Sequence, residues 1–97
     1  MAAVCMTTVS ARFWQVGDNG LVRWDYNCHF VGNVIDNKPS SGEQCGGICI
    51  SNSQCTHFTH ANGYCYLKRH TGNWRETDDT ANTCGFIPGR SAQNERK

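Results

Sequence analysis

The segment from Ser41 to Cys55 reads SGEQCGGICISNSQC and predicts a short capped helix. Ser41 is followed three residues later by Gln44, which is the pattern of a capping box. In that motif the hydroxyl and the amide each satisfy a free backbone N–H at the start of the helix. We therefore expect Ser41 to be the N-cap and the helix to end near Asn52.

One face of this helix carries its apolar side chains. Cys45, Ile48 and Cys49 recur at i, i+3 and i+4, so we expect the face that they share to be buried. Gly46 and Gly47 each cost about 1 kcal/mol relative to alanine in a helix interior. The helix would hardly persist alone, and its cysteines are expected to pin it to the rest of the fold.

Seven cysteines in a chain of 97 residues indicate disulfide bonds and an oxidising compartment. This length allows one domain, and the modest apolar share, 38%, leaves only a small surplus of burial over conformational entropy. A bridge that closes a loop of about ten residues or more contributes roughly 2 to 4 kcal/mol. We therefore expect a secreted or extracellular protein held by three bridges, with a reduced cytosolic protein as the alternative.

Charge and hydropathy narrow the range of partners. The net charge of +1 gives no general attraction to nucleic acid or to anionic lipid. No apolar run approaches the roughly 20 residues needed to cross a bilayer, so we expect no membrane span. Residues 1–8 lack the basic region and the long apolar segment of a secretory signal, which favours a mature or excised piece with an added Met1.

A β-hairpin is predicted directly after the helix. Residues 54–60 and 64–68 are rich in aromatic residues and threonine, as strands are, and Asn62-Gly63 supplies the positive φ angles of a tight turn. Strict alternation would place Cys55 and Phe58 on opposite faces, so the first strand must bend near Thr56 or begin after Cys55.

The remaining segments give weaker signals. Residues 17–20 form a turn that predicts a hairpin entering the domain, and residues 21–24 are the expected first core strand. Residues 33–41 are polar and are interpreted as a loop leading into the helix. After Arg69 the chain is polar until residues 84–87, the expected last strand.

At this point the cysteine pattern resembles the PAN/apple family. The resemblance covers about residues 14–87 and is carried by Trp24-Asp-Tyr-Asn-Cys28, Cys45-Gly-Gly-Ile-Cys49, Cys55-Thr-His-Phe58 with Cys65-Tyr-Leu-Lys68, and Cys84-Gly-Phe-Ile87. The residues alone leave open 15 pairings of six cysteines, multiplied by seven for the choice of the odd one. The resemblance implies the bonds Cys28–Cys84, Cys45–Cys65 and Cys49–Cys55.

The same resemblance implies an α+β fold, a curved antiparallel sheet of about five strands wrapped around one short helix. We expect an N-terminal extension at residues 1–12 with an extra cysteine, the PAN/apple domain at 13–88, and a disordered polar tail at 89–97. Trp14, Trp24, Phe58 and Leu67 are the expected core residues.

Family members recognise proteins or glycans and have no catalysis of their own, so the resemblance implies a binding module that is not an enzyme. We favour a carbohydrate-binding, lectin-like module for acidic or sulfated glycans, with a protein–protein adhesion or antagonist module as the alternative. The candidate ligand-binding residues combine positive charge with exposed aromatic rings. They are Tyr64, Tyr66, Lys68, Arg69, His70, Trp74 and Arg75.

Cys5 lies outside the six-cysteine pattern and is left over. A leftover cysteine in an oxidising compartment predicts either a covalent homodimer or an unpaired thiol. A zinc site at Cys45, Cys49 and Cys55 with His57 and His60 is the rival interpretation of these residues, but paired C-x2-C motifs are absent. We therefore expect disulfides and no metal, cofactor or catalytic residue.

Overall fold

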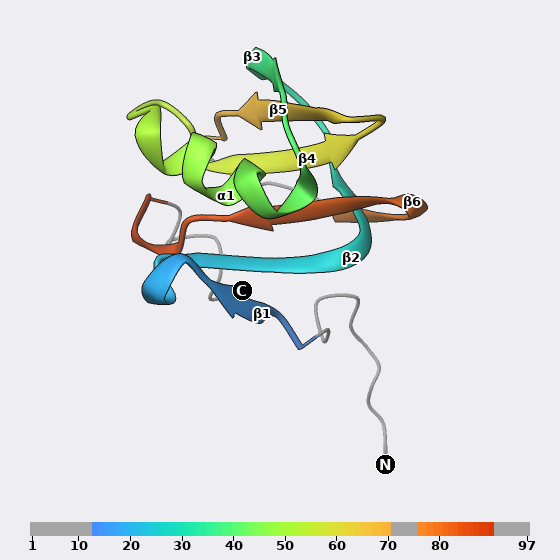
Figure 1. Cartoon of the computed structure of the whole chain (residues 1–97), viewed down its shortest axis with the longest axis horizontal. Helices are drawn as coiled ribbons and strands as arrows, with labels where there is room; N and C mark the ends of the chain where they lie inside the picture. The colour runs from blue at the N-terminus through green and yellow to red at the C-terminus, as the bar shows by residue number, and fades with distance from the viewer. Residues whose placement is uncertain (1–12, 71–75, 91–97) are drawn as a thin grey trace.

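A computed structural model describes residues 13–70 and 76–90, with the backbone alone at 76–80. The described residues form a six-stranded antiparallel sheet with one α-helix packed on one face (Figure 1), which confirms a small disulfide-rich α+β fold. The elements are β1 (Gln15–Gly17), the 3-10 turn η3 (Asp18–Gly20), β2 (Val22–Phe30), β3 (Val34–Pro39), α1 (Gly42–Ser51), β4 (His57–Ala61), β5 (Tyr64–Lys68) and β6 (Glu76–Phe86). Their order across the sheet is β1-β2-β6-β4-β5-β3.

The helix has the predicted caps. The Ser41 hydroxyl accepts a hydrogen bond from the Gln44 backbone N–H, and the Gln44 side chain accepts one from the Ser41 backbone N–H, so the capping box is confirmed. Asn52 is the C-cap, as expected. Cys45 and Cys49 are fully buried and Ile48 is half-buried, which confirms the inward face of the helix.

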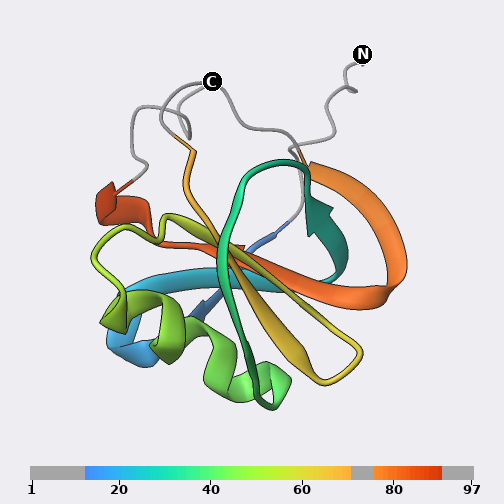
Figure 2. The ribbon, with the colours of Figure 1, turned by 90° about the horizontal axis from the view of Figure 1, so that it is seen from above.

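Both predicted hairpins are present. β1 pairs with β2, and β4 pairs with β5 through Asn62 at φ 53° and Gly63 at φ 82°. β4 begins at His57, which confirms that the strand starts after Cys55. The strand β6 is far longer than the predicted strand at residues 84–87, and it curves strongly when the sheet is seen from above (Figure 2).

The prediction of a loop at residues 33–41 is wrong. β3 lies at the edge of the sheet and pairs with β5 from Val34↔Lys68 to Pro39↔Tyr64. All six of its residues are exposed, so burial imposes no alternation of apolar and polar side chains that a sequence pattern would reveal. Pro39 lacks an N–H and is tolerated on an edge strand, where one side of the backbone stays unpaired.

Three disulfides join the helix and the strands with the implied pairing. Cys45–Cys65 links α1 to β5, Cys49–Cys55 links α1 to the segment before β4, and Cys28–Cys84 links β2 to β6. The first two bridges lie in the core between the helix and the sheet, with Phe58 and Leu67. The third lies in a second cluster with Phe30 and Phe86.

A left-handed residue allows β2 to contribute to both clusters. Val22 and Trp24 pack with the helix-side cluster, whereas Cys28 and Phe30, also at even positions, belong to the second cluster. Asn27 lies between them at φ 60°, where the register of β2 against β6 shifts. The irregularity reverses the alternation, so Cys28 reaches Cys84 on the face of the sheet away from the helix.

Arg90 connects the end of the described residues to the helix. The Arg90 guanidinium donates hydrogen bonds to four backbone carbonyls in and just after the last turn of the helix, those of Cys49, Ile50, Asn52 and Cys55. A cation at this end of a helix also interacts favourably with its dipole. The expected tail from residue 91 onward and the extension with Cys5 lie outside the described residues.

The closest packing in the sheet predicts the effect of one methyl group. A Cβ at Gly85 would lie 2.3 Å from Phe58 Cζ and 2.7 Å from the backbone oxygen of Arg23, and neither contact can relax without moving the core. We expect Gly85→Ala to lower the free energy of unfolding by about 1 to 3 kcal/mol. Gly89 has open space around it, so Gly89→Ala is the matched control. Urea unfolding with the disulfides intact measures both, and equal midpoints would contradict the packing described.

Candidate functional site

The predicted ligand-binding residues are only partly brought together. Tyr64 and Tyr66 lie on the face of β5 away from the helix, with ring centroids 6.2 Å apart, and Tyr64 is 42% exposed. Arg69 is exposed and His70 is half-buried. Trp74 and Arg75 lie outside the described residues.

Lys68 is not at the surface, contrary to the expectation of an exposed basic cluster. Its side chain is 3% exposed, and its ammonium donates a hydrogen bond to the backbone oxygen of Phe30. Burial also lowers the pKa of Lys68, because the charged form loses its hydration. Lys68 therefore links the end of β5 to the end of β2. Its buried ammonium group is not accessible to a ligand.

A buried histidine lies beside Lys68 in this second cluster. The His57 ring is fully buried, 4.7 Å from the Phe30 ring and 4.8 Å from the His70 ring, and its Nδ1 lies 2.7 Å from Thr56 Oγ1. Burial, and then the nearby charges of His70 and Lys68, lower the pKa of His57 to about 3. Burial, and then the nearby charge of Lys68, lower the pKa of His70 as well. His57 is thus a neutral core residue at physiological pH.

A cleft of about 630 Å³ lies on the opposite face of the sheet, between the first turns of α1 and the strand β2. Its volume is within the range of small-molecule sites, about 300 to 1,000 Å³. Val22, Phe58 and Gly46 give it an apolar floor. The other lining residues are Gly17, Asp18, Trp24, Tyr26, Ser41, Gly42, Glu43 and Thr83.

Two aromatic rings form one wall of this cleft. Trp24 and Tyr26 are alternate residues of β2, so both project toward the helix side, and their rings meet edge to face at 5.0 Å. Gly17 allows the indole to lie across β1, because a Cβ there would be 3.2 Å from two indole atoms. Tyr26 is 58% exposed, so its ring is accessible to a ligand.

The rim of the cleft carries two carboxylates from segments far apart in the sequence. Asp18 belongs to η3 and adopts φ 49°, a left-handed conformation that aspartate tolerates better than most residues. Its carboxylate lies against the helix, since a Cβ at Gly46 would be 2.7 Å from Asp18 Oδ2. Glu43 stands in the first turn of α1.

A histidine from the sheet helps to position the start of the helix. The side chain of His60 on β4 lies on the helix side, and its Nε2 is 2.7 Å from the backbone oxygen of Ser40. The capping box begins at the next residue, Ser41, which itself lines the cleft. The rim at Glu43 is therefore held through a capped helix end that the sheet supports.

This arrangement suits binding. An aromatic wall, an apolar floor and hydrogen-bond acceptors at the rim match a ligand with one apolar face and several donors. The six cysteines of the described residues are all in disulfides, and in that part of the chain no group of three or more His, Cys, Asp or Glu residues is placed to hold a metal ion.

Sequence reasoning found the parts of this cleft but not the cleft itself. The turn at residues 17–20 and the capped helix start were both predicted, and Trp24 was assigned to the core. The local signals do not reveal that Asp18 of η3 lies against Gly46 of α1, because these residues are far apart in the sequence.

Comparison with known proteins leaves the chain without an assigned relative. No protein-family model matches the sequence, and no curated protein matches it significantly. Within the described residues, no helix is both long and apolar enough to cross a membrane.

The buried His57 predicts how stability depends on pH. Its pKa is about 3 in the folded protein and about 6.5 when exposed, so the unfolded chain binds a proton more readily below pH 6.5. Stability is therefore fully present above pH 6.5 and is lost as the pH falls toward 3. We expect a loss of about 2 kcal/mol between about pH 7.5 and about pH 5.

Urea unfolding at these two pH values measures the loss, with the His57→Gln variant as the comparison. The variant is expected to be less stable at neutral pH, because it disturbs the packing around Phe30, but its stability should fall less on acidification. Parallel losses in the two proteins would contradict a buried neutral His57.

Proposed function

We propose that this chain is an extracellular, non-catalytic carbohydrate-binding module of the PAN/apple type, and that the cleft beside Trp24 and Tyr26 is its binding site. The observation that carries the proposal is the exposed Tyr26 ring set against an indole at 5.0 Å, above an apolar floor and below a carboxylate rim. The three disulfides and their nested pairing support both the compartment and the family.

The side chains of the cleft match both the apolar face and the hydroxyl groups of a sugar ring. The C–H face of a pyranose ring is apolar and packs on aromatic rings, while its hydroxyl groups donate hydrogen bonds to carboxylates. Trp24 and Tyr26 supply the stacking surface, and Asp18 and Glu43 supply the charged acceptors. Ser41 and Thr83 add hydroxyl groups at the same rim.

The cleft does not favour the acidic or sulfated glycans expected from the basic run at residues 68–70. Its charged residues are acidic, and the first cation of that run, Lys68, is buried. The proposed ligand is therefore still a carbohydrate, but the proposed site differs from the one predicted from the sequence. It lies on the helix side of the sheet and not around Tyr64 and Tyr66 on the outer face of the β4–β5 hairpin.

Two exposed tyrosines on opposite faces of the sheet test this assignment. We expect Tyr26→Ala to weaken binding of a saccharide by about five- to tenfold, because a stacked ring contributes about 1 kcal/mol beyond the area it buries. Tyr64→Ala removes an exposed ring from the other face and should leave the affinity unchanged. A glycan array identifies the saccharide, and calorimetric titration measures the affinities.

Three other results would contradict the proposed site or the proposed function. Binding that is lost in Tyr64→Ala and kept in Tyr26→Ala would place the site on the outer face of the hairpin. Failure to bind any saccharide would reject the proposed function, and saturable capture of one extracellular protein, unaffected by deglycosylation, would favour the protein–protein alternative.

A further inference from the structure

The charge of the cleft points to a narrower class of ligand. Resting on the proposed function, we propose that the cleft selects glycans that carry free amino groups, such as oligosaccharides of β-linked glucosamine, over their N-acetylated and sulfated counterparts. The proposal follows from charge complementarity between a protonated amine and the two carboxylates of the rim.

The two carboxylates converge on the cleft from separate elements. Asp18 approaches from η3 and lies against α1 at Gly46, and Glu43 lies one helical turn before Gly46. Among the described residues that line the cleft, none is lysine, arginine or histidine. A cationic ligand therefore meets two negative charges and no positive side chain of the lining.

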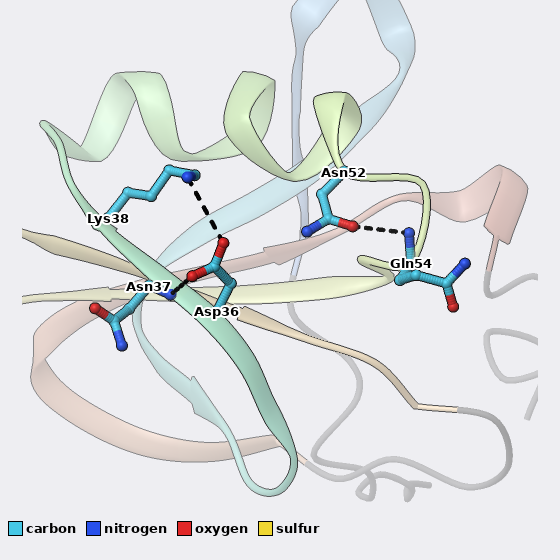
Figure 3. A network of polar contacts seen from close by, with 5 residues as sticks. All are labelled: Asp36, Asn37, Lys38, Asn52 and Gln54. Atoms are coloured by element: carbon cyan, nitrogen blue, oxygen red, sulfur yellow. Dashed lines mark hydrogen bonds and ion pairs between the residues drawn. The ribbon is translucent and has the colours of Figure 1, made fainter.

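Neither carboxylate is engaged elsewhere in the part of the chain that the structure describes. Asp18 and Glu43 form no ion pair or side-chain hydrogen bond there, whereas Asp36 on β3 has a cationic partner. The Asp36 Oδ2 atom is 3.6 Å from Lys38 Nζ, and its Oδ1 accepts from the Asn37 backbone N–H (Figure 3). The cleft thus offers two negative charges that form no ion pair with a described side chain.

The partial positive charge at the start of α1 opposes the binding of a cation only weakly. The N-terminus of a helix carries the equivalent of about half a positive charge, and here the capping box already satisfies part of it. Two full negative charges at the rim outweigh that half charge. The cleft therefore attracts cations and repels sulfate and carboxylate groups.

The aromatic wall acts in the same direction. An ammonium group is attracted to the face of tryptophan or tyrosine by the ring quadrupole, and the attraction is strongest when the site is partly desolvated. Trp24 and Tyr26 stand beside the carboxylates in one cleft, so a glucosamine unit can place its ring on Tyr26 and its amine toward the rim. N-acetylation removes the charge and both of these contributions.

Calorimetric titration of the whole chain with three probes tests the inference. The probes are a short oligosaccharide of β-linked glucosamine, its fully N-acetylated form and a sulfated oligosaccharide, at a pH where the amines are protonated. We expect the amino sugar to bind about tenfold more tightly than the N-acetylated form, the sulfated probe to bind weakest, and added salt to weaken only the first.

Conservative variants test whether Asp18 and Glu43 cause the preference for the amino sugar. Asp18→Asn and Glu43→Gln should each weaken binding of the amino sugar about three- to fivefold more than they weaken binding of the N-acetylated form, since each removes one exposed charge that only the amine requires. Asn tolerates the left-handed conformation of Asp18, and an unfolding midpoint checks that both variants are folded. Asp36→Asn, which removes a carboxylate outside the aromatic cleft, is the matched control and should change nothing.

The outcomes separate this inference from the proposed function. If the N-acetylated form binds as tightly as the amino sugar, or if Asp36→Asn weakens binding as much as Asp18→Asn, the amine selectivity is wrong and the carbohydrate function stands. If neither sugar binds, both fail. Binding of a short lysine peptide with neither sugar bound would also overturn both and would assign the cleft to a protein partner.

Discussion

Two disulfides one helical turn apart hold α1 against the sheet, and the rest of the structure depends on this clamp. Cys45 and Cys49 bond to Cys65 and Cys55, and all four sulfurs lie in the core. A ten-residue helix with two interior glycines has little stability of its own. The covalent links, the capping box and the hydrogen bonds from Arg90 together keep it in place, and the cleft exists only where the helix stands.

The glycines that weaken the helix also make the cleft possible. A Cβ at Gly46 would lie 2.7 Å from Asp18 Oδ2, so glycine at this position lets the Asp18 carboxylate lie against the helix. Gly85 does the same for Phe58 on the sheet, which forms part of the cleft floor. Intrinsic helix propensity is thus given up for close packing, and the disulfides offset the loss.

Local signals in the sequence predict the helix, its caps, both hairpins and the start of β4, because each depends on residues within a few positions of one another. The prediction missed β3, since an edge strand with exposed side chains carries no apolar periodicity. It missed most of β6 because residues 76–83 contain no large apolar residue. Lys68 was misplaced for a related reason. Its neighbour Arg69 is exposed, and only the packing of β5 against Phe30 shows that the Lys68 ammonium points inward. Residues 18 and 43 line one cleft, and no local pattern in the sequence records that they do.

The groups that would meet a ligand are held by constraints that do not depend on the ligand. Asp18 is fixed by a turn with two consecutive left-handed residues, Glu43 by a capped and disulfide-linked helix, and Trp24 by its packing across Gly17. Binding therefore orders few protein torsions, and this reduces the entropic cost that usually limits affinity for small, flexible saccharides. The same constraints that stabilise a small core thus hold the backbone positions of the proposed site.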